Sequence, residues 1–313
     1  MSAHTKFADG DLETGDGSPT NHEEVAVEPV TKGGKDMSPG AVAARRWVLR
    51  RAVCGEFVAT FIFLFVAISQ GYNNSRAGLD NPSHGAISVG FCAVAVIFSF
   101  ADVSGAHFNP AVTFATVVTR KMSIPKGLMY LCAQLSASIL SNLAIFMVFP
   151  GVTEPDNLRR LAVTPAADVN PIQSILMEAA LTFILVYVIF AVAFDEVDAN
   201  NVKVVSKDES GKETSVKTGN LTIYTTGGHT KNTFAPFAIG LTLGFLCTVG
   251  GSVSGGAFNP ARVFGSAICT GVWEDHYVYW IGDLGGAAAA GLLHGLFSVM
   301  KTKTKEPSLL EAE

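Results

Sequence analysis

The stretch Ser254–Gly265 reads SGGAFNPARVFG and places Asn259, Pro260 and Ala261 directly before Arg262. Asparagine is a favoured helix N-cap, and proline suits the first helical position because its missing N–H would be unpaired there anyway. The triplet therefore predicts a helix whose free N–H groups and positive dipole end lie at Asn259. Only about ten residues follow before a Thr-Gly pair, fewer than the ~20 that cross a bilayer. A helix that starts at membrane depth must be buried in protein or line a watery cavity.

A second copy of this stretch lies in the first half of the chain. Ser104–Phe114 reads SGAHFNPAVTF, with Asn109, Pro110 and Ala111 in the same order, and matches the later stretch at seven of eleven positions. The two stretches, called here the first and second box, indicate an internal repeat.

The composition is that of a membrane protein. Of 313 residues 49% are hydrophobic, the mean hydropathy is +0.35, and only 16% are charged, against the usual ~25% of soluble domains. The net charge of −5 comes with no basic patch that would indicate nucleic acid. The first hydrophobic run begins near Trp47 and is long enough to span, so we expect no cleavable signal peptide. The five cysteines are odd in number and lack metal-ligand spacing. We therefore interpret them as small apolar packing residues rather than as disulfide partners or metal ligands.

Six apolar stretches have the length of a membrane span, and the two boxes lie after the second and the fifth. The predicted spans are Trp47–Ser69, His84–Ala101, Pro125–Phe149, Pro171–Phe194, Phe234–Val253 and Tyr277–Met300. Each half then holds three spans and one half-helix, and because three is odd the second half enters the membrane upside down. The sequence thus predicts an all-α membrane protein with six transmembrane helices and two half-helices in an inverted repeat.

A glutamate that occurs at equivalent positions supports the division of the sequence into two repeated halves. Glu56 begins EFVATF and Glu178 begins EAALTF, each on the first span of its half. The distance from the glutamate to the box asparagine is longer in the second half, and the polar loop 195–233 accounts for the excess. Each glutamate is expected to accept hydrogen bonds from the irregular backbone before a half-helix, although a buried acid could also relay protons in an ion-coupled transporter.

The channel domain is predicted to occupy residues 45–300, between a polar, disordered N-terminal tail (1–44) and a C-terminal tail (301–313). Lys and Arg collect before the first span, between the second and third, in the long loop and after the last span, so both termini and this loop are expected in the cytosol. Asn73 begins an Asn-Asn-Ser glycosylation motif that is expected on the opposite face, although such motifs are also frequent by chance. The long loop is either a solvated connection or a gating lid phosphorylated at Ser206, Ser210 or Ser215.

The two boxes together suit a pore for neutral solutes. Half-helices that enter from opposite faces bring their positive ends together, and the amide NH₂ groups of Asn109 and Asn259 then donate into the lumen. A water molecule bound there turns its own hydrogens away, which breaks the chain along which a proton hops. The helix ends and Arg262 also repel cations; alternatively, Arg262 forms a salt bridge that only holds the fold. A non-conducting adhesion protein, in which the boxes would be idle, is a further alternative.

Over residues 47–300 the chain resembles the aquaporin (major intrinsic protein) family, through the two Asn-Pro-Ala boxes, the repeated glutamate and the ending HYVYWIGDLGG. The resemblance implies a right-handed six-helix bundle, a pore in each protomer and a homotetramer in the lipid bilayer. It also implies a selectivity filter, which falls on Val89, Cys247, Gly256 and Arg262. Water-selective members usually have an aromatic residue and a histidine at the first two positions, whereas this chain has neither.

The sequence therefore predicts a passive water channel, in the plasma membrane or a vesicle or vacuole membrane, that excludes ions and protons and works without a cofactor. The alternative is an aquaglyceroporin-type facilitator for glycerol, urea, ammonia or hydrogen peroxide. Val263 stands where glycerol channels commonly have aspartate, which favours water. No nucleophile–base pair, metal cluster or phosphate-binding loop points to an enzyme.

Three further residues of the channel domain carry individual expectations. His107 is expected to form a structural hydrogen bond near the inner mouth, with pH sensing as the alternative. His294 is expected in the core. Asp283 departs from the family, which usually has proline there, and its place near a cavity or an interface stays open.

Overall fold

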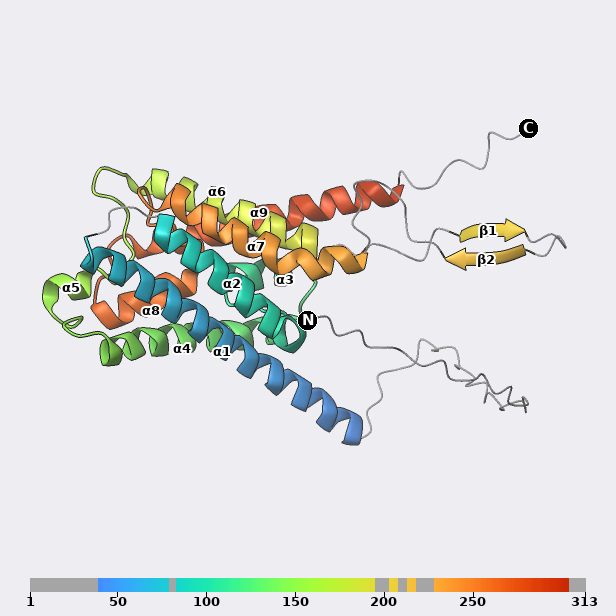
Figure 1. The fold of residues 1–313 in the computed structure, drawn as a ribbon, viewed down its shortest axis with the longest axis horizontal. Coiled ribbons are helices and arrows are strands. Elements are labelled where there is room, and N and C mark those ends of the chain that lie inside the picture. The colour runs from blue at the N-terminus through green and yellow to red at the C-terminus, as the bar shows by residue number, and fades with distance from the viewer. Residues whose placement is uncertain (1–38, 79–82, 195–202, 208–212, 218–227, 304–313) are drawn as a thin grey trace, which may run out of the picture. The chain divides into compact units, whose positions relative to one another are not determined.

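The computed structural model describes residues 39–78, 83–194, 203–207, 213–217 and 228–303. Residue contacts divide the chain into two units, Met1–Ala43 and Ala44–Glu313. Apart from the first residues of α1, the helices belong to the second unit (Figure 1).

Each predicted span corresponds to one long helix. These helices are α1 (Pro39–Arg76), α2 (Ser83–Ser104), α4 (Ile124–Val148), α6 (Pro171–Ile189), α7 (Gly228–Gly250) and α9 (His276–Lys303). The π-helix η1 (Phe190–Phe194) extends α6. Three helices are short, namely α3 (Pro110–Val118), α5 (Pro155–Arg159) and α8 (Pro260–Thr270). Helices α3 and α8 are the half-helices that the two boxes predict.

The N-terminal boundary differs from the prediction. Helix α1 begins at Pro39, because proline suits the first turn of a helix and the residues after it favour helix. Residues 39–44, expected to be disordered, are therefore helical. The rest of the predicted tail, residues 1–38, lies outside the described residues.

The outward faces of the long helices are apolar. Four helices of the described part are long and apolar enough to cross a membrane, over Val42–Arg76, Ser83–Ser104, Ile124–Val148 and Pro171–Phe194, and α7 adds the shorter apolar stretch Phe234–Gly250. Large apolar side chains such as Phe91, Met147 and Ile172 are exposed on these helices. An apolar surface of this extent needs lipid rather than water around it.

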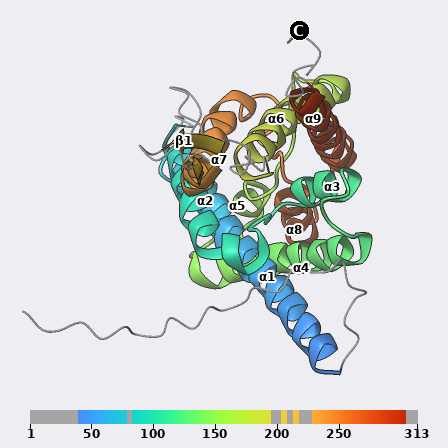
Figure 2. The same cartoon turned by 90° about the vertical axis from the view of Figure 1, so that its right-hand side faces the viewer.

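The helix contacts follow the inverted repeat. Half-helix α8 packs on α4, and half-helix α3 packs on α9, so each half-helix contacts the last long helix of the other half. Helix α2 packs on its counterpart α7, and α6 packs on α9. In Figure 2, α3 lies beside α9 and α8 lies beside α4. The repeat is thus a property of the packing as well as of the sequence.

Helices α2 and α7 cross at glycines. A Cβ atom on Gly240 would lie 2.7 Å from the carbonyl oxygen of Gly90, and one on Gly90 would lie 2.9 Å from that of Gly240. Neither distance admits a side chain, so this close approach requires glycine on both helices. The crossing fixes the position of Val89, the neighbour of Gly90.

The long loop contains a hairpin that the sequence did not predict. Strand β1 (Lys203–Lys207) pairs antiparallel with β2 (Glu213–Lys217), and Val204 lies opposite Val216. Valine and threonine at these positions favour strand over a solvated loop. Ser206 lies in β1 and Ser215 in β2, whereas Ser210 lies outside the described residues.

Candidate pore site

Each half-helix is capped by the asparagine of its box. The extended backbone of Asn109 (φ −153°, ψ 121°) lets its Oδ1 accept a hydrogen bond from the Ala111 N–H at 2.8 Å. Asn259 (φ −156°, ψ 100°) accepts from the Ala261 N–H at 3.1 Å. These hydrogen bonds fix both amides at the positive end of a helix.

The two caps also bind each other's box. Asn109 Nδ2 donates to the carbonyl oxygen of Phe258 at 2.7 Å, and Asn259 Nδ2 donates to that of Phe108 at 3.0 Å. An amide NH₂ group has two hydrogens, so one hydrogen of each asparagine is used in this exchange and one remains. The prediction that the whole NH₂ group stays free for the lumen was wrong in this respect, because the opposite box supplies a buried acceptor.

Glu56 holds the backbone before the first half-helix. Its Oε1 accepts from Ser104 Oγ at 2.7 Å and from the His107 N–H at 2.9 Å. Its Oε2 accepts from the Phe108 N–H at 2.8 Å and from Gln134 Nε2 at 2.9 Å. The carboxylate is fully buried with four donors around it, which is how proteins accommodate an unpaired buried charge.

Glu178 has the same place before the second half-helix. Its Oε1 accepts from Ser254 Oγ at 2.5 Å and from the Ala257 N–H at 2.9 Å, and its Oε2 accepts from the Phe258 N–H at 2.6 Å. This side chain is also fully buried. The two glutamates therefore form equivalent backbone supports.

The supported backbone is left-handed at matching positions in the two boxes. Phe108 and Phe258 have φ of 35° and 32°, and Ala106 and Gly256 have φ of 49° and 57°. This conformation costs roughly 1–2 kcal/mol for each non-glycine residue. Hydrogen bonds from the neighbouring N–H groups to a charged carboxylate offset that cost.

The sequence analysis missed the second layer of support. Tyr130 Oη donates to the carbonyl oxygen of Ser104 at 2.6 Å, and Tyr279 Oη donates to that of Ser254 at 2.7 Å. The two serines could have been found from the repeat, because each stands five positions before its box asparagine. The tyrosines lie on α4 and α9 at nearly the same distance after the two boxes, but no motif marks them.

The four predicted filter residues line one cavity of about 230 Å³. This Arg262 cavity is bounded by Phe63, Val89, Cys247, Gly256, Phe258 and Arg262, among others. The structure thus brings together residues from α2, α7, the second box and the start of α8.

Arg262 is held by backbone carbonyls. Its Nη1 donates to the carbonyl oxygens of Gly255, at 3.3 Å, and Gly256. Within the described part of the chain the one ion pair joins Arg159 and Glu274, so Arg262 does not form the salt bridge considered as an alternative. A guanidinium held in this way keeps its charge at the cavity wall.

A second cavity, of about 460 Å³, is lined by both asparagines. This His107 cavity is bounded by His107, Phe108, Asn109, Lys121, Lys126 and Asn259, among others. His107 Nδ1 lies 3.1 Å from Thr113 Oγ1, a structural contact inside the first half.

Residues of the two boxes line both cavities. Phe63 lines the Arg262 cavity and Phe108 lines the His107 cavity, and their ring centroids are 4.7 Å apart. Phe258 lines the Arg262 cavity, and its carbonyl oxygen accepts from Asn109, which lines the His107 cavity. Neither Glu56 nor Glu178 lines either cavity.

The remaining predicted residues line neither cavity. Asn73 is exposed in the last turn of α1. His294 is buried, with its ring 5.9 Å from that of Tyr187 and 5.7 Å from that of Phe190. Asp283, whose place the sequence left open, is completely buried in α9.

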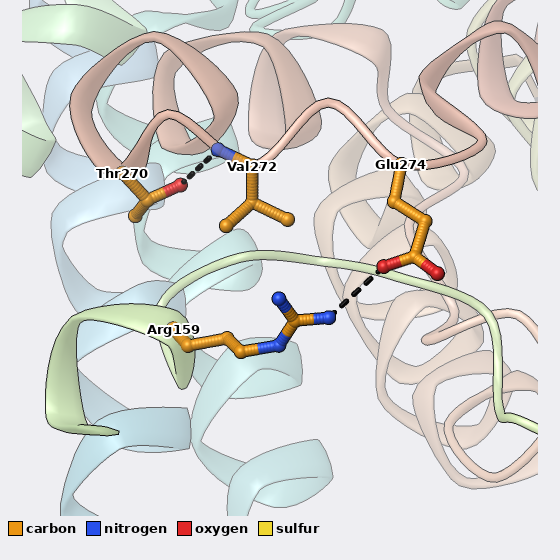
Figure 3. Close-up of polar contacts among 4 residues, drawn as sticks. All are labelled: Arg159, Thr270, Val272 and Glu274. Atoms are coloured by element: carbon orange, nitrogen blue, oxygen red, sulfur yellow. Dashed lines mark hydrogen bonds and ion pairs between the residues drawn. The ribbon is translucent and has the colours of Figure 1, made fainter. Parts of the chain in front are cut away.

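An exposed ion pair connects the two halves near the end of α8. Arg159 Nη2 of α5 lies 2.9 Å from Glu274 Oε2, and nearby the Val272 N–H donates to Thr270 Oγ1 at 3.3 Å (Figure 3). Two opposite charges so far apart in the chain leave no sequence signal, which is why the pair was missed.

The comparisons with known proteins agree with this architecture. The family model of the major intrinsic proteins matches residues 43–206 and 220–294. Aquaporin-B of Dictyostelium discoideum is 52% identical over 286 residues, covering 90% of this chain and 92% of the relative. Aquaporin TIP2-1 of Arabidopsis thaliana is 34% identical over 251 residues, covering 78% and 86%.

A solved structure shows the same fold. The X-ray structure of the aquaglyceroporin from Plasmodium falciparum superposes with a TM-score of 0.62 at 21% sequence identity, covering 82% of this chain and 98% of that one. The chain belongs to the major intrinsic protein (aquaporin) family. It is an integral membrane protein with the aquaporin fold, and its family supports a channel for water or small solutes.

Proposed function

We propose that this chain conducts water passively between the Arg262 cavity and the His107 cavity, and that it excludes ions and protons at the two asparagines. The observation that carries the proposal is the reciprocal binding of the boxes, in which Asn109 and Asn259 line the His107 cavity and Phe258, which Asn109 binds, lines the Arg262 cavity. A route between the cavities therefore passes two fixed amides at two helix N-termini.

The electrostatics of the two boxes favour neutral solutes. The N-termini of α3 and α8 each carry roughly half a positive charge, and Arg262 adds a full one at the adjacent cavity. Each asparagine keeps one N–H hydrogen for a passing water oxygen. A water that accepts these hydrogen bonds directs its own hydrogens away, so a proton has no continuous chain of hydrogen bonds to follow.

A wider solute range is the second candidate, and the composition of the Arg262 cavity favours it. Val89, Cys247 and Gly256 give this cavity small, mostly apolar side chains beside Arg262. Such a wall leaves room for the carbon atoms of glycerol and offers the carbonyl and guanidinium groups of Gly256 and Arg262 to its hydroxyls.

An ion-coupled transporter fits the geometry less well. The acids that would relay protons, Glu56 and Glu178, are occupied by hydrogen bonds from the box backbone and line neither cavity. A proton gradient is therefore expected to leave solute flux unchanged.

We also propose that the His107 cavity faces the cytosol. Lys121 and Lys126 line it, and positive residues favour the cytosolic side of short connections. Both termini would then be cytosolic. The proposed assembly is a homotetramer with one pore in each protomer.

Stopped-flow light scattering on vesicles with the purified protein tests these proposals. Osmotic shrinkage is compared for water, glycerol and urea, with empty vesicles as the control. Water flux above that of empty vesicles, without proton leak, supports the water channel. Glycerol or urea flux in addition to water flux selects the second candidate, and free proton leak contradicts ion exclusion.

A further inference from the structure

The two glutamates that support the boxes differ in one hydrogen-bond donor. Glu56 Oε2 accepts from the Phe108 N–H and from Gln134 Nε2. Glu178 Oε2 accepts from the Phe258 N–H, and among the described residues no side-chain amide donates to Glu178 as Gln134 does to Glu56.

Asp283 stands where that amide would be. Tyr130 on α4 and Tyr279 on α9 make the same hydrogen bond to a box serine. Gln134 and Asp283 each follow their tyrosine by four residues, which places them one helical turn further on the same face. Asp283 is thus the counterpart of Gln134, with a carboxyl group in place of an amide.

The side chain of Asp283 meets Glu178 inside the protein. Both residues are completely buried, and Asp283 reaches the face of α6 that carries Glu178, because Thr182, one helical turn after Glu178, donates to it. Helices α6 and α9 touch here so closely that a Cβ atom on Gly282 would lie 2.8 Å from Glu178 Cβ. Asp283 Oδ1 accepts from Thr182 Oγ1 at 3.3 Å, whereas Oδ2 has no partner among the donors of the described residues.

Two carboxylates in contact in a buried site cannot both be ionised. The cation in this region is Arg262 on α8, and it donates to the carbonyl oxygens of Gly255 and Gly256 rather than to either acid. Besides α6 and α8, half-helix α3 and η1 pack against α9, and neither of these two contains a charged or titratable residue. One of the two acids must therefore hold a proton.

The hydrogen bonds decide which acid holds it. Glu178 accepts from two backbone N–H groups and one serine hydroxyl, and Asp283 accepts from one threonine hydroxyl. Donors stabilise the charged form of a carboxyl group, so Glu178 is the ionised member. The unpartnered Oδ2 of Asp283 is then the oxygen that carries the proton.

We propose that Asp283 is a neutral carboxylic acid that donates its proton in a hydrogen bond to Glu178 Oε2, as Gln134 donates to Glu56. Asp283 is thereby a positioning residue of the second box. It acts through Glu178 on the Ala257 and Phe258 N–H groups, and through them on the carbonyl oxygen that Asn109 binds. The consequence for selectivity rests on the proposed function, whereas the protonation of Asp283 does not.

Infrared spectroscopy of the purified wild-type protein at neutral pH tests the proton directly. A protonated carboxyl group gives a C=O band apart from those of carboxylates and amides, and this band shifts in D₂O. We expect such a band, lowered in frequency by ¹³C labelling of aspartate side chains, unchanged by labelling of glutamate, and absent from Asp283→Asn. Absence of the band in the wild type, or a shift with labelled glutamate instead, overturns the proposal.

Matched variants test the positioning role. Asparagine can donate to Glu178 and accept from Thr182, so Asp283→Asn should give folded protein within about twofold of the wild-type yield on size-exclusion chromatography. Asp283→Leu cannot donate, and its yield should fall roughly tenfold, the factor that a lost hydrogen bond to a charged group represents. Gln134→Leu should show a comparable loss in the first half.

A yield of Asp283→Asn as low as that of Asp283→Leu overturns the proposal, because it means that an ionised aspartate is needed. These readouts do not depend on transport. A chain that fails to conduct water in vesicles but shows the aspartate band refutes the proposed function and leaves this inference standing.

Discussion

The first and second boxes share one framework and differ in the groups attached to it. Both have an asparagine cap, a buried glutamate, a serine and a tyrosine in equivalent hydrogen bonds. Three residues after the asparagine the first box has Val112, on the His107 cavity, while the second has Arg262, on the Arg262 cavity. The duplicated framework holds the backbone of both boxes. The single arginine makes the Arg262 cavity chemically different from the His107 cavity.

Removing a supporting glutamate is expected to have the largest effect. Glu56→Ala leaves four buried donors without an acceptor and should reduce the free energy of unfolding by about 3–5 kcal/mol. Glu178→Ala should cost less, because the Asp283 carboxyl group stays beside the freed donors. Thermal unfolding in detergent measures both, and an equal or larger loss in Glu178→Ala would show that the two supports do not differ as described.

The second-largest effect is expected from replacing Arg262 with valine, the residue that the first box has at the equivalent position, Val112. Arg262→Val removes the positive charge of the guanidinium. The electrostatic repulsion between this charge and a cation in the cavity exceeds about 1.4 kcal/mol. Proton leak through reconstituted vesicles, followed with a pH-sensitive dye, should rise at least roughly tenfold. Val112→Ile is the matched control in the first box and should leave the leak unchanged. No rise in Arg262→Val would remove Arg262 from ion exclusion.

A larger side chain at Val89 tests the width of the Arg262 cavity. Val89→Phe should reduce glycerol permeability roughly tenfold, the lower end of what a misfit in a pocket costs, and water permeability much less. Ile87→Phe, on the exposed face of the same helix, is the control. An equal loss for both solutes would count against Val89 as a filter residue.

The thiol of Cys247 provides a chemical probe of the same cavity. Mercurials should block transport, and Cys247→Ser should relieve the block with little change in basal flux, because a hydroxyl replaces the thiol with similar volume. Cys54→Ser and Cys132→Ser serve as controls, since both thiols lie on the exposed faces of α1 and α4. Block that persists in Cys247→Ser places the reactive thiol elsewhere.

The ion pair between the halves should matter least. Arg159 and Glu274 are 67% and 62% exposed, and exposed pairs contribute about 0–1 kcal/mol. Arg159→Ala should therefore change the free energy of unfolding by less than about 1 kcal/mol, with unchanged water flux. A larger loss on thermal unfolding would mean that this contact, and not the boxes alone, holds the two halves together.

Local chemistry made much of the fold predictable. Asn-Pro at a helix start is a short-range signal, so both half-helices could be located from the letters alone. The long apolar stretches gave the six spans, although the start of α1 and the β1–β2 hairpin were missed. Those two misses lie outside the six long apolar runs, so no run marks the ends of these elements.

The site was less predictable where its contacts join distant segments. The reciprocal hydrogen bonds of Asn109 and Asn259, the donation by Gln134 and the contact of Asp283 with α6 all cross between helices. An amide or a carboxyl group in an apolar stretch has no period or spacing that names its partner. The repeat shows that two positions are equivalent, and the packing shows what each one binds.

The sequence by itself determined that this protein is an inverted pair of three spans and a half-helix, because capping and hydrophobic length act within a few residues of each other along the chain. Only the tertiary structure decided how the boxes bind, that four residues from α2, α7 and the second box line one cavity, and that Asp283 lies against the part of α6 that carries Glu178. Those outcomes depend on helices approaching at glycines such as Gly90 and Gly240, and such distances arise from the packing of the whole molecule.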